Sequence, residues 1–260
     1  MLGLSIKDVS KIWNPGGPDP VPAVSNLTLD VAPAEFVVLL GPSGCGKSSL
    51  LYIVAGLEQP TSGTVTFDGL PITEPSPERS LIFQEASLYP WLTVKDNVTF
   101  GLKINHTAPA KREAAAQKLL KLVGLGNAGN KRPHELSGGM RQRAALARAL
   151  AMRPKVMLMD EPFAALDIQT RARMQGHLLD IWESSKASIL LVTHSIDEAL
   201  ALADRIVVFT SRPGRIKAEI TLDLPRPRDL RSPEMVDYAR RCEALLAEEV
   251  ERAFKEQELA

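Results

Sequence analysis

A glycine-rich segment, Gly41–Ser48, constrains the fold of this chain more than any other feature of its sequence. It reads Gly-Pro-Ser-Gly-Cys-Gly-Lys-Ser and matches the pattern G-x-x-x-x-G-K-[ST]. The apolar run Phe36–Leu40 precedes it, and a helix-like run, Ser48–Val54, follows it. The sequence therefore predicts a buried strand, a tight loop and a helix, which is the context in which this pattern forms a phosphate-binding loop.

The residue types of this segment, which we call the phosphate loop, suit a polyphosphate. Glycines let backbone N–H groups face phosphate oxygens, and the following helix adds the positive end of its dipole. Lys47 supplies a positive charge for the β- and γ-phosphates, and the Ser48 hydroxyl is placed to bind Mg²⁺. The nucleotide-binding residues expected here are Gly41, Pro42, Ser43, Gly44, Cys45, Gly46, Lys47, Ser48 and Ser49. Because the Cys45 thiol lies beside a helix N-terminus and a lysine, we expect it to be alkylated readily and to be protected by nucleotide.

Two further apolar runs end in polar side chains. Val156–Met159 is followed by Asp160 and Glu161, and Ile189–Thr193 is followed by His194. Open α/β sheets bind ligands at the carboxyl ends of parallel strands. Asp160 is then suited to hold Mg²⁺, mostly through water. Glu161 is suited to act on the water that attacks the γ-phosphate, as general base or orienting group. His194 either hydrogen-bonds the γ-phosphate or has a structural role.

The rest of the pattern predicts an α/β fold with a mostly parallel sheet. Apolar runs that begin at Val156, Ile189 and Ile206 alternate with helical stretches, as in sheets covered by helices. We expect one domain over residues 1–260, with a core at 1–87 and 152–223, a helical subdomain at 88–151 and a C-terminal helical tail at 224–260. Other expected elements are strands at Leu4–Val9, Leu27–Val31, Thr64–Phe67, Ser80–Phe83 and Gly214–Leu222, a loop at Asn14–Pro22, and helices at Ala110–Val123, Met140–Ala151 and Ser232–Phe254.

Composition argues against several classes of function. The chain has 31 basic and 31 acidic residues, which argues against binding to nucleic acid through a strongly basic face. Its two cysteines, Cys45 and Cys242, are far apart and lack metal-like spacing, so we expect no disulfide framework or zinc site and a reducing, cytosolic compartment. We expect no secretory signal, and no apolar run approaches the roughly 20 residues of a membrane span.

A second glycine-rich segment, Leu136–Met140, narrows the class of protein. It reads Leu-Ser-Gly-Gly-Met and is followed by Arg-Gln-Arg. Ser137 suits a helix N-cap, and Gly138 and Gly139 leave N–H groups exposed at the start of a helix, which makes a second anion site in the same chain. A kinase that transfers a phosphoryl group would need the phosphate loop but not this segment.

With this second segment the sequence resembles the ATP-binding subunits of ABC transporters over nearly its whole length. The resemblance implies a P-loop NTPase (RecA-like) core with a mostly parallel sheet, an N-terminal antiparallel β-subdomain and an inserted α-helical subdomain. It also implies hydrolysis of ATP with Mg²⁺ by two copies of the chain. The Ser-Gly-Gly turn of each copy would face the ATP bound to the other copy.

Further roles follow from the resemblance alone. Gln84 is similar to the glutamine that senses Mg²⁺ and the attacking water, and Asp167 to the residue of a loop that couples two active sites. Trp13 is similar to the aromatic residue that stacks on adenine, or else it packs within the protein. The implied catalytic residues are Lys47, Gln84, Glu161 and His194, further nucleotide-binding residues are Trp13, Ser137, Gly138, Gly139 and Asp167, and metal ligands are Ser48, Gln84 and Asp160.

More narrowly, Tyr89–Val94, Asp96–Val98 and Ser211–Ile216 resemble the nitrate, sulfonate and taurine import branch. The solutes implied are sulfonate, taurine, nitrate, bicarbonate or a thiamine-precursor pyrimidine. Met140 departs from the glutamine that is commonest there, but Ser137 and backbone groups carry the phosphate contact. The implied partners are integral membrane permease subunits at the cytoplasmic face of the inner or plasma membrane and, indirectly, an extracytoplasmic solute-binding protein. Leu88, Tyr89 and Trp91 either receive a permease helix or form the core of the helical insertion.

The main alternative is an ABC ATPase that acts on DNA or the ribosome rather than in transport. Such proteins typically need a long coiled-coil insertion or two tandem nucleotide domains. This sequence has one phosphate loop, no heptad run and no excess of basic residues. We therefore expect no nucleic-acid partner.

Overall fold

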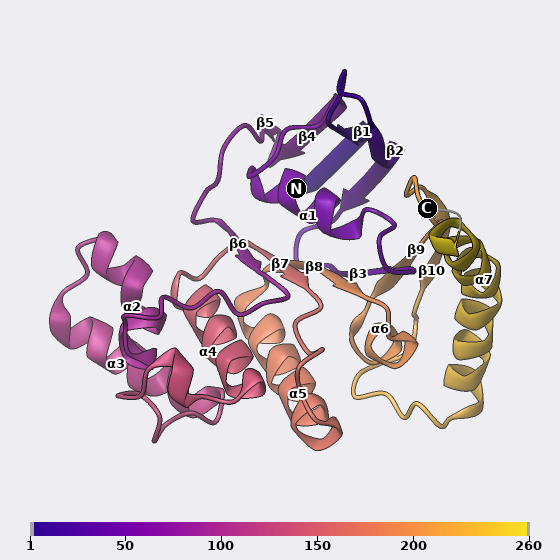
Figure 1. Ribbon diagram of the computed structural model, residues 1–260. Coiled ribbons are helices and arrows are strands. Elements are labelled where there is room, and N and C mark those ends of the chain that lie inside the picture. The colour runs from indigo at the N-terminus through magenta and orange to yellow at the C-terminus, as the bar shows by residue number, and fades with distance from the viewer. Residues whose placement is uncertain (1–2, 259–260) are drawn as a thin grey trace. The chain divides into compact units, whose positions relative to one another are not determined.

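The computed structural model describes residues 3–258, which form two compact units (Figure 1). The first unit comprises Met1–Ser76 and Ser188–Ala260, and the second comprises Pro77–Ala187. Both units combine strands with helices, as the sequence predicts. None of the helices within residues 3–258 has both the length and the apolar character that a membrane crossing requires.

The first unit contains a four-stranded antiparallel sheet in the order β2-β1-β4-β5. In β1 the buried residues Leu4, Ile6 and Val9 face the core, in the pattern of a half-buried strand. Strand β1 runs beyond the expected limit to Trp13, which pairs with Val21. The strands are β1 (Leu4–Trp13), β2 (Val21–Val31), β4 (Ser62–Phe67) and β5 (Leu70–Pro71).

A second set of strands in the first unit carries the phosphate loop. Strand β3 is parallel to both β8 and β9, and β10 is antiparallel to β9. All five residues of β3 and all six of β8 are buried, which explains why both read as continuous apolar runs. These strands are β3 (Phe36–Leu40), β8 (Ser188–Thr193), β9 (Arg205–Phe209) and β10 (Ile216–Thr221), and the helices are α1 (Lys47–Ala55), α6 (Ile196–Leu202) and α7 (Pro233–Glu258).

The second unit joins a parallel strand pair to a group of helices. Strands β6 and β7 pair in parallel, and three helices with a short 3-10 turn lie between them in the chain, as expected for an insertion. The strands are β6 (Arg79–Ile82) and β7 (Val156–Asp160), and the helices are α2 (Val94–Ile104), α3 (Pro109–Leu122), η1 (Pro133–Glu135), α4 (Gly138–Ala151) and α5 (Ile168–Ser185).

Candidate functional site

The phosphate loop connects β3 to α1. Gly46 has a φ of 97° and stands at the N-cap of α1, in a backbone region that favours glycine. A Cβ atom at this position would collide with the carbonyl oxygen of Ala23 in β2. Ser43 and Gly44 are exposed at the tip of the loop. The sequence of the loop therefore sets both its turn and its close packing on β2.

Lys47 is folded back over its own loop. Its side chain is buried, and Nζ donates hydrogen bonds to the carbonyl oxygens of Gly41 at 2.8 Å and Pro42 at 2.7 Å. Nζ also lies 3.4 Å from Sγ of Cys45. Cys45 itself is 1% exposed, so this conformation does not support the ready alkylation expected from its position in the sequence. The ammonium group thus lies inside the loop where phosphate oxygens are expected.

Trp13 and His194 also belong to the first unit. Nε1 of Trp13 donates to Oγ of Ser49 on α1 at 3.3 Å, and Nζ of Lys11 lies 4.3 Å from the ring centroid. The half-buried indole is therefore held at the first turn of α1, next to the phosphate loop. His194 is exposed directly after β8. The turn at its position is fixed because the Thr193 hydroxyl accepts the N–H of Ser195 at 3.0 Å.

The second unit places two acidic residues at the end of β7. Asp160 is the buried last residue of the strand, at 3% exposure, and Glu161 follows with a φ of 45°. Nε2 of Gln84, which follows β6, donates to Oε2 of Glu161 at 3.3 Å. The structure therefore brings together two residues, Gln84 and Glu161, that the sequence predicted separately for the handling of the attacking water.

The Ser-Gly-Gly turn lies at the start of α4. Oγ of Ser137 accepts the N–H of Met140 at 3.3 Å and so acts as the predicted N-cap. A Cβ atom at Gly139 would lie 2.8 Å from Cδ2 of Leu166, so this glycine permits close packing against the segment after β7. The turn thus lies next to the segment that leads to Asp167.

Asp167 is the N-cap of α5. Its Oδ1 accepts the N–H of Thr170 at 3.0 Å. Hydrogen bonds from Thr170 hold the pKa of the Asp167 carboxyl below its ordinary value, because they favour the ionised form. The side chain is therefore a carboxylate at neutral pH and an exposed acceptor at the start of α5.

Two oxygen-bearing side chains, one in each unit, have the chemistry of ligands for Mg²⁺. Mg²⁺ prefers oxygen ligands and keeps several waters beside one or two carboxylates and substrate phosphates. Asp160 offers a buried carboxylate and Ser48 a hydroxyl at the start of α1. Within residues 3–258, no group of three or more His, Cys, Asp or Glu side chains is arranged to hold a metal ion. Such a closed protein cage is not what Mg²⁺ at a nucleotide requires.

Two residues that the sequence did not single out fix the segment around Gln84. Gln142 on α4 is buried, and its Nε2 donates to the carbonyl oxygen of Phe83 at 3.1 Å. The guanidinium of Arg148 donates to the carbonyl oxygens of Ser87 at 2.8 Å and Ala86 at 3.2 Å. Helix α4 therefore holds both ends of the Gln84 segment. Both side chains lie in an ordinary helical pattern, so only their partners show this role.

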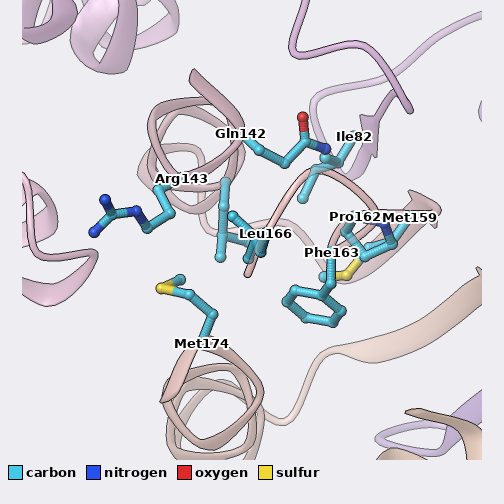
Figure 2. Close-up of a pocket in the computed structure, with 9 residues that line it drawn as sticks. Ile82, Gln142, Arg143, Met159, Pro162, Phe163, Leu166 and Met174 are labelled. Atoms are coloured by element: carbon cyan, nitrogen blue, oxygen red, sulfur yellow. The ribbon is translucent and has the colours of Figure 1, made fainter. Parts of the chain in front are cut away.

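A cavity beside α4 belongs to the packing of the second unit (Figure 2). Its volume is about 10 Å³, which is the space of one water molecule at most. Figure 2 shows mainly apolar side chains around it. It is therefore no ligand site. The residues that line it are Ile82, Gln142, Arg143, Leu146, Met159, Pro162, Phe163, Leu166 and Met174.

Comparisons with known proteins agree on one family. Residues 24–164 match the family model described as ABC transporter. An uncharacterized ABC transporter ATP-binding protein of Methanocaldococcus jannaschii is 46% identical over 97% of this chain and 94% of its own length. The nitrate import ATP-binding protein NrtD of Synechocystis sp. is 45% identical, over 94% of this chain and 95% of that protein. The taurine import ATP-binding protein TauB of Mesorhizobium japonicum is 55% identical over 76% and 77%.

Solved structures give the same result. The dimeric structure of a post-hydrolysis state of the ATP-binding cassette MJ0796, bound to ADP and Pi, is 31% identical to this chain and has a TM-score of 0.78. The match covers 85% of this chain and 100% of that chain. A second dimeric structure of the same cassette matches with the same TM-score.

Proposed function

Because the chain belongs to the ABC transporter family, we propose that it is the ATP-hydrolysing subunit of an importer for a small solute of the nitrate, sulfonate and taurine type. The observation that carries the proposal is the presence of two phosphate-gripping turns in one chain, Gly41–Ser48 and Ser137–Gly139. Relatives named for nitrate import and taurine import support the branch. The α/β P-loop NTPase fold expected from the sequence is confirmed by the similarity to a solved ATP-binding cassette.

The phosphate loop would bind the β- and γ-phosphates of ATP. Its backbone N–H groups and the N-terminus of α1 favour negative charge. The Lys47 ammonium would exchange the carbonyl oxygens of Gly41 and Pro42 for phosphate oxygens, which form stronger, charge-assisted hydrogen bonds. We assign stacking on adenine to Trp13, because its indole is held at the first turn of α1.

Asp160 and Ser48 would hold Mg²⁺, and Gln84 would contact it through its amide oxygen. When bound, the ion neutralises charge on the β- and γ-phosphates during transfer. The buried carboxylate of Asp160 is suited to this role because Mg²⁺ is a hard cation that prefers oxygen ligands. The proposed function requires that Asp160 and Ser48 be brought to one nucleotide.

Glu161 would accept the proton of the attacking water. The hydrogen bond from Nε2 of Gln84 to Oε2 of Glu161 would orient the carboxylate for this role. His194 would hydrogen-bond the γ-phosphate from the end of β8. Most of the acceleration would come from the electrostatic positioning of these groups, as in phosphoryl transfer generally.

Two copies of the chain would close around two ATP molecules. Ser137, Gly138 and Gly139 of each copy would contact the γ-phosphate bound to the other, and Asp167 would couple the two sites. A solved ATP-binding cassette that resembles this chain is dimeric and is bound to ADP and Pi. The exposure of Ser137 and Asp167 in the single chain supports this arrangement.

A membrane permease would receive the motion through the aromatic segment that follows Gln84. Trp91 is 68% exposed, and the rings of Tyr89 and Trp91 lie 5.7 Å apart. Tyr89 also packs on Phe100 at 4.5 Å, so the segment presents a firm apolar surface for a short helix. The protein would then lie at the cytoplasmic face of the membrane, and the permease would link it to an extracytoplasmic solute-binding protein.

The variant Glu161→Gln tests the proposed chemistry. We expect ATP hydrolysis to fall by about 100-fold or more, because general-base catalysis contributes about 10²–10⁴, while ATP binding persists and a dimer accumulates. Phosphate release, equilibrium binding and light scattering after gel filtration measure the three quantities. Glu183→Gln, which alters an exposed carboxylate of α5, is the control and should hydrolyse ATP normally. Normal turnover by E161Q would reject Glu161 as the base.

Affinity purification separates transport from action on nucleic acid. The detergent-solubilised complex should contain a membrane permease, and it should release no more nucleic acid than a control purification. Co-purification of ribosomes or DNA without a permease would favour the non-transport alternative. Formation of ADP and free phosphate without a phosphorylated acceptor would exclude a kinase.

A further inference from the structure

Helix α7 carries a buried carboxylate that the proposed reaction does not use. The side chain of Glu249 is 6% exposed, whereas that of its neighbour Glu248 is 82% exposed. Oε1 of Glu249 accepts a hydrogen bond from Nζ of Lys217 on β10 at 2.8 Å. Oε2 accepts the backbone N–H of Ser211 at 2.8 Å. Glu249 therefore ties α7 to the segment that follows β9, and Figure 1 shows α7 alongside these strands.

The carboxylate is held in its ionised form. Burial raises the pKa of Glu249, but hydrogen bonds from Lys217 and the Ser211 N–H, together with the positive charges of Lys217 and Arg252, hold the pKa below its ordinary value. A buried charge depends on its partners, because an uncompensated one is strongly destabilising. The contact with Ser211 is therefore a firm one, unlike the exposed ion pair between Lys217 and Glu248.

The segment that Glu249 holds is a closed turn, Thr210–Arg215, which we call the support turn. The N–H of Thr210 donates to the carbonyl oxygen of Arg215 at 2.9 Å, and the N–H of Arg215 donates to the Thr210 hydroxyl at 3.0 Å. The Thr210 hydroxyl in turn donates to the carbonyl oxygen of Pro213 at 3.1 Å. Because the turn is closed on itself, a displacement at Ser211 moves the whole turn.

The support turn packs directly against the phosphate loop. The N–H of Gly214 donates to the carbonyl oxygen of Ala23 at 2.8 Å. A Cβ atom at Gly214 would collide with the carbonyl oxygen of Cys45, and one at Gly46 would collide with that of Ala23. Backbone therefore meets backbone at both glycines, so the support turn and β2 together fix the part of the phosphate loop around Cys45 and Gly46.

We propose that Glu249 is a positioning residue for ATP binding: it fixes the support turn, and the support turn holds the phosphate loop in its binding conformation. The inference rests on the proposed function. Charge-assisted hydrogen bonds to phosphate depend strongly on the placement of the N–H groups. A displacement of α7 that breaks the hydrogen bond between Glu249 and the Ser211 N–H therefore weakens ATP binding, which makes this contact a control point for nucleotide affinity.

The substitution Glu249→Gln tests the proposal. Glutamine keeps the size of the side chain but loses its charge, and only its carbonyl oxygen can accept a hydrogen bond, so either Lys217 or the Ser211 N–H loses its acceptor. We expect the Kd for Mg-ATP, measured by calorimetry, to rise about fivefold or more, within the usual range of coupling between sites. We expect KM to rise in parallel while kcat stays within about twofold, because the change weakens binding and leaves Glu161 unaltered.

Two control variants separate positioning from a general loss of stability. Glu248→Gln removes the exposed negative charge beside the same Lys217 and leaves the Ser211 contact intact, so its Kd should equal that of the wild type. Leu246→Ala removes a buried side chain of α7 without altering Glu249. It should lower the Tm at least as much as E249Q does and leave the Kd unchanged.

The alkylation rate of Cys45 gives a local readout. Cys45 is 1% exposed behind the support turn, so E249Q should raise its rate with iodoacetamide, read by peptide mass mapping, and E248Q should not. A wild-type Kd and a wild-type Cys45 rate in E249Q would overturn the proposal, as would an equal rise in Kd in L246A. If E249Q fails to fold, E249D, which keeps the charge but is too short to reach both donors, should show an intermediate Kd, and a wild-type Kd would again overturn the proposal. Failure of the wild type to bind Mg-ATP would instead reject the proposed function.

Discussion

Asn97 holds the aromatic segment before α2 to the helix itself. It is 0% exposed, and its Oδ1 accepts the N–H of Tyr89 at 2.8 Å. Its Nδ2 lies at hydrogen-bonding distance from the carbonyl oxygens of Tyr89 at 3.1 Å, Leu92 at 3.3 Å and Thr93 at 3.0 Å. One amide therefore lies within reach of four backbone groups of a segment that has no regular structure of its own.

At this residue we predict that Asn97→Ala lowers the free energy of unfolding by about 2–4 kcal/mol, because it removes the acceptor of the Tyr89 N–H and the amide donor that lies near three carbonyl oxygens. Urea denaturation followed by circular dichroism measures the change. Asn105→Ala, at the exposed C-terminal end of α2, should change stability by less than about 0.5 kcal/mol. Equal urea midpoints for N97A and the wild type would show that the amide does not hold the segment.

Single residues also mark the limit of what the sequence predicts. The phosphate loop, the acidic pair after β7 and the Ser137 N-cap could be found because each has a local pattern with a local cause. Gln142, Arg148 and Glu249 could not, because each is an ordinary polar residue within a helical pattern whose partner is far away in the sequence. For Glu249 the partner is 38 residues away. Burial of such a residue depends on tertiary packing that periodicity does not encode.

At the scale of elements, α4 and α7 begin with the same cap. Oγ of Ser137 accepts the N–H of Met140 at 3.3 Å, and Oγ of Ser232 accepts the N–H of Met235 at 3.3 Å. The two hydroxyls therefore contribute similarly to helix stability. Under the proposed function only one of them, Ser137, has a second role, which is to contact ATP bound to another copy.

We therefore predict that Ser137→Ala and Ser232→Ala each lower the free energy of unfolding by about 1 kcal/mol. ATP hydrolysis should fall by about tenfold or more in S137A alone, because loss of one charge-stabilising donor typically costs that much or more. Thermal unfolding and phosphate release at saturating ATP measure the two effects. An equal loss of hydrolysis in both variants would mean that the Ser137 hydroxyl acts only as a helix cap.

The elements themselves were predicted well where they are buried and less well where pairing sets their length. Strands β3, β7, β8 and β9 read as apolar runs because nearly every residue in them is buried. Strand β1 was expected to end at Val9 but continues to Trp13, because its far end pairs with β2. Strand β5 has only two residues, too few to show a period. The expected subdomain boundaries at 87, 151 and 223 stay a prediction.

At the scale of the whole molecule, the two phosphate-gripping turns lie in different units. The phosphate loop belongs to the first unit and the Ser-Gly-Gly turn to the second. Each reaction site would then take one turn from each of two copies. Two chains that are mutated in different turns could therefore still form one intact site. Such shared sites are expected in a dimer with two-fold symmetry, in which the same surface of both chains forms the interface.

We predict that a mixture of Lys47→Ala and Ser137→Ala chains hydrolyses ATP faster than either variant alone, because K47A should be inactive and S137A should keep about a tenth of the wild-type rate or less. In a mixed pair, one site combines the intact phosphate loop of one chain with the intact Ser-Gly-Gly turn of the other. Random pairing gives half mixed pairs with one intact site each, so activity should recover to roughly a quarter of the wild-type value. Phosphate release from equimolar mixtures measures it. Absence of recovery, in mixtures shown by crosslinking to contain mixed pairs, would contradict sites shared between chains.

The backbone at Glu161 has a consequence for engineering. A φ of 45° costs a side chain with a Cβ on the order of 1 kcal/mol, and glycine or asparagine adopts it at lower cost. A mutant library screened only for survival of heating would therefore accumulate glycine or asparagine here, and the survivors would be folded but inert. Directed evolution of a more thermostable variant must therefore select for ATP hydrolysis and for thermal stability in the same round.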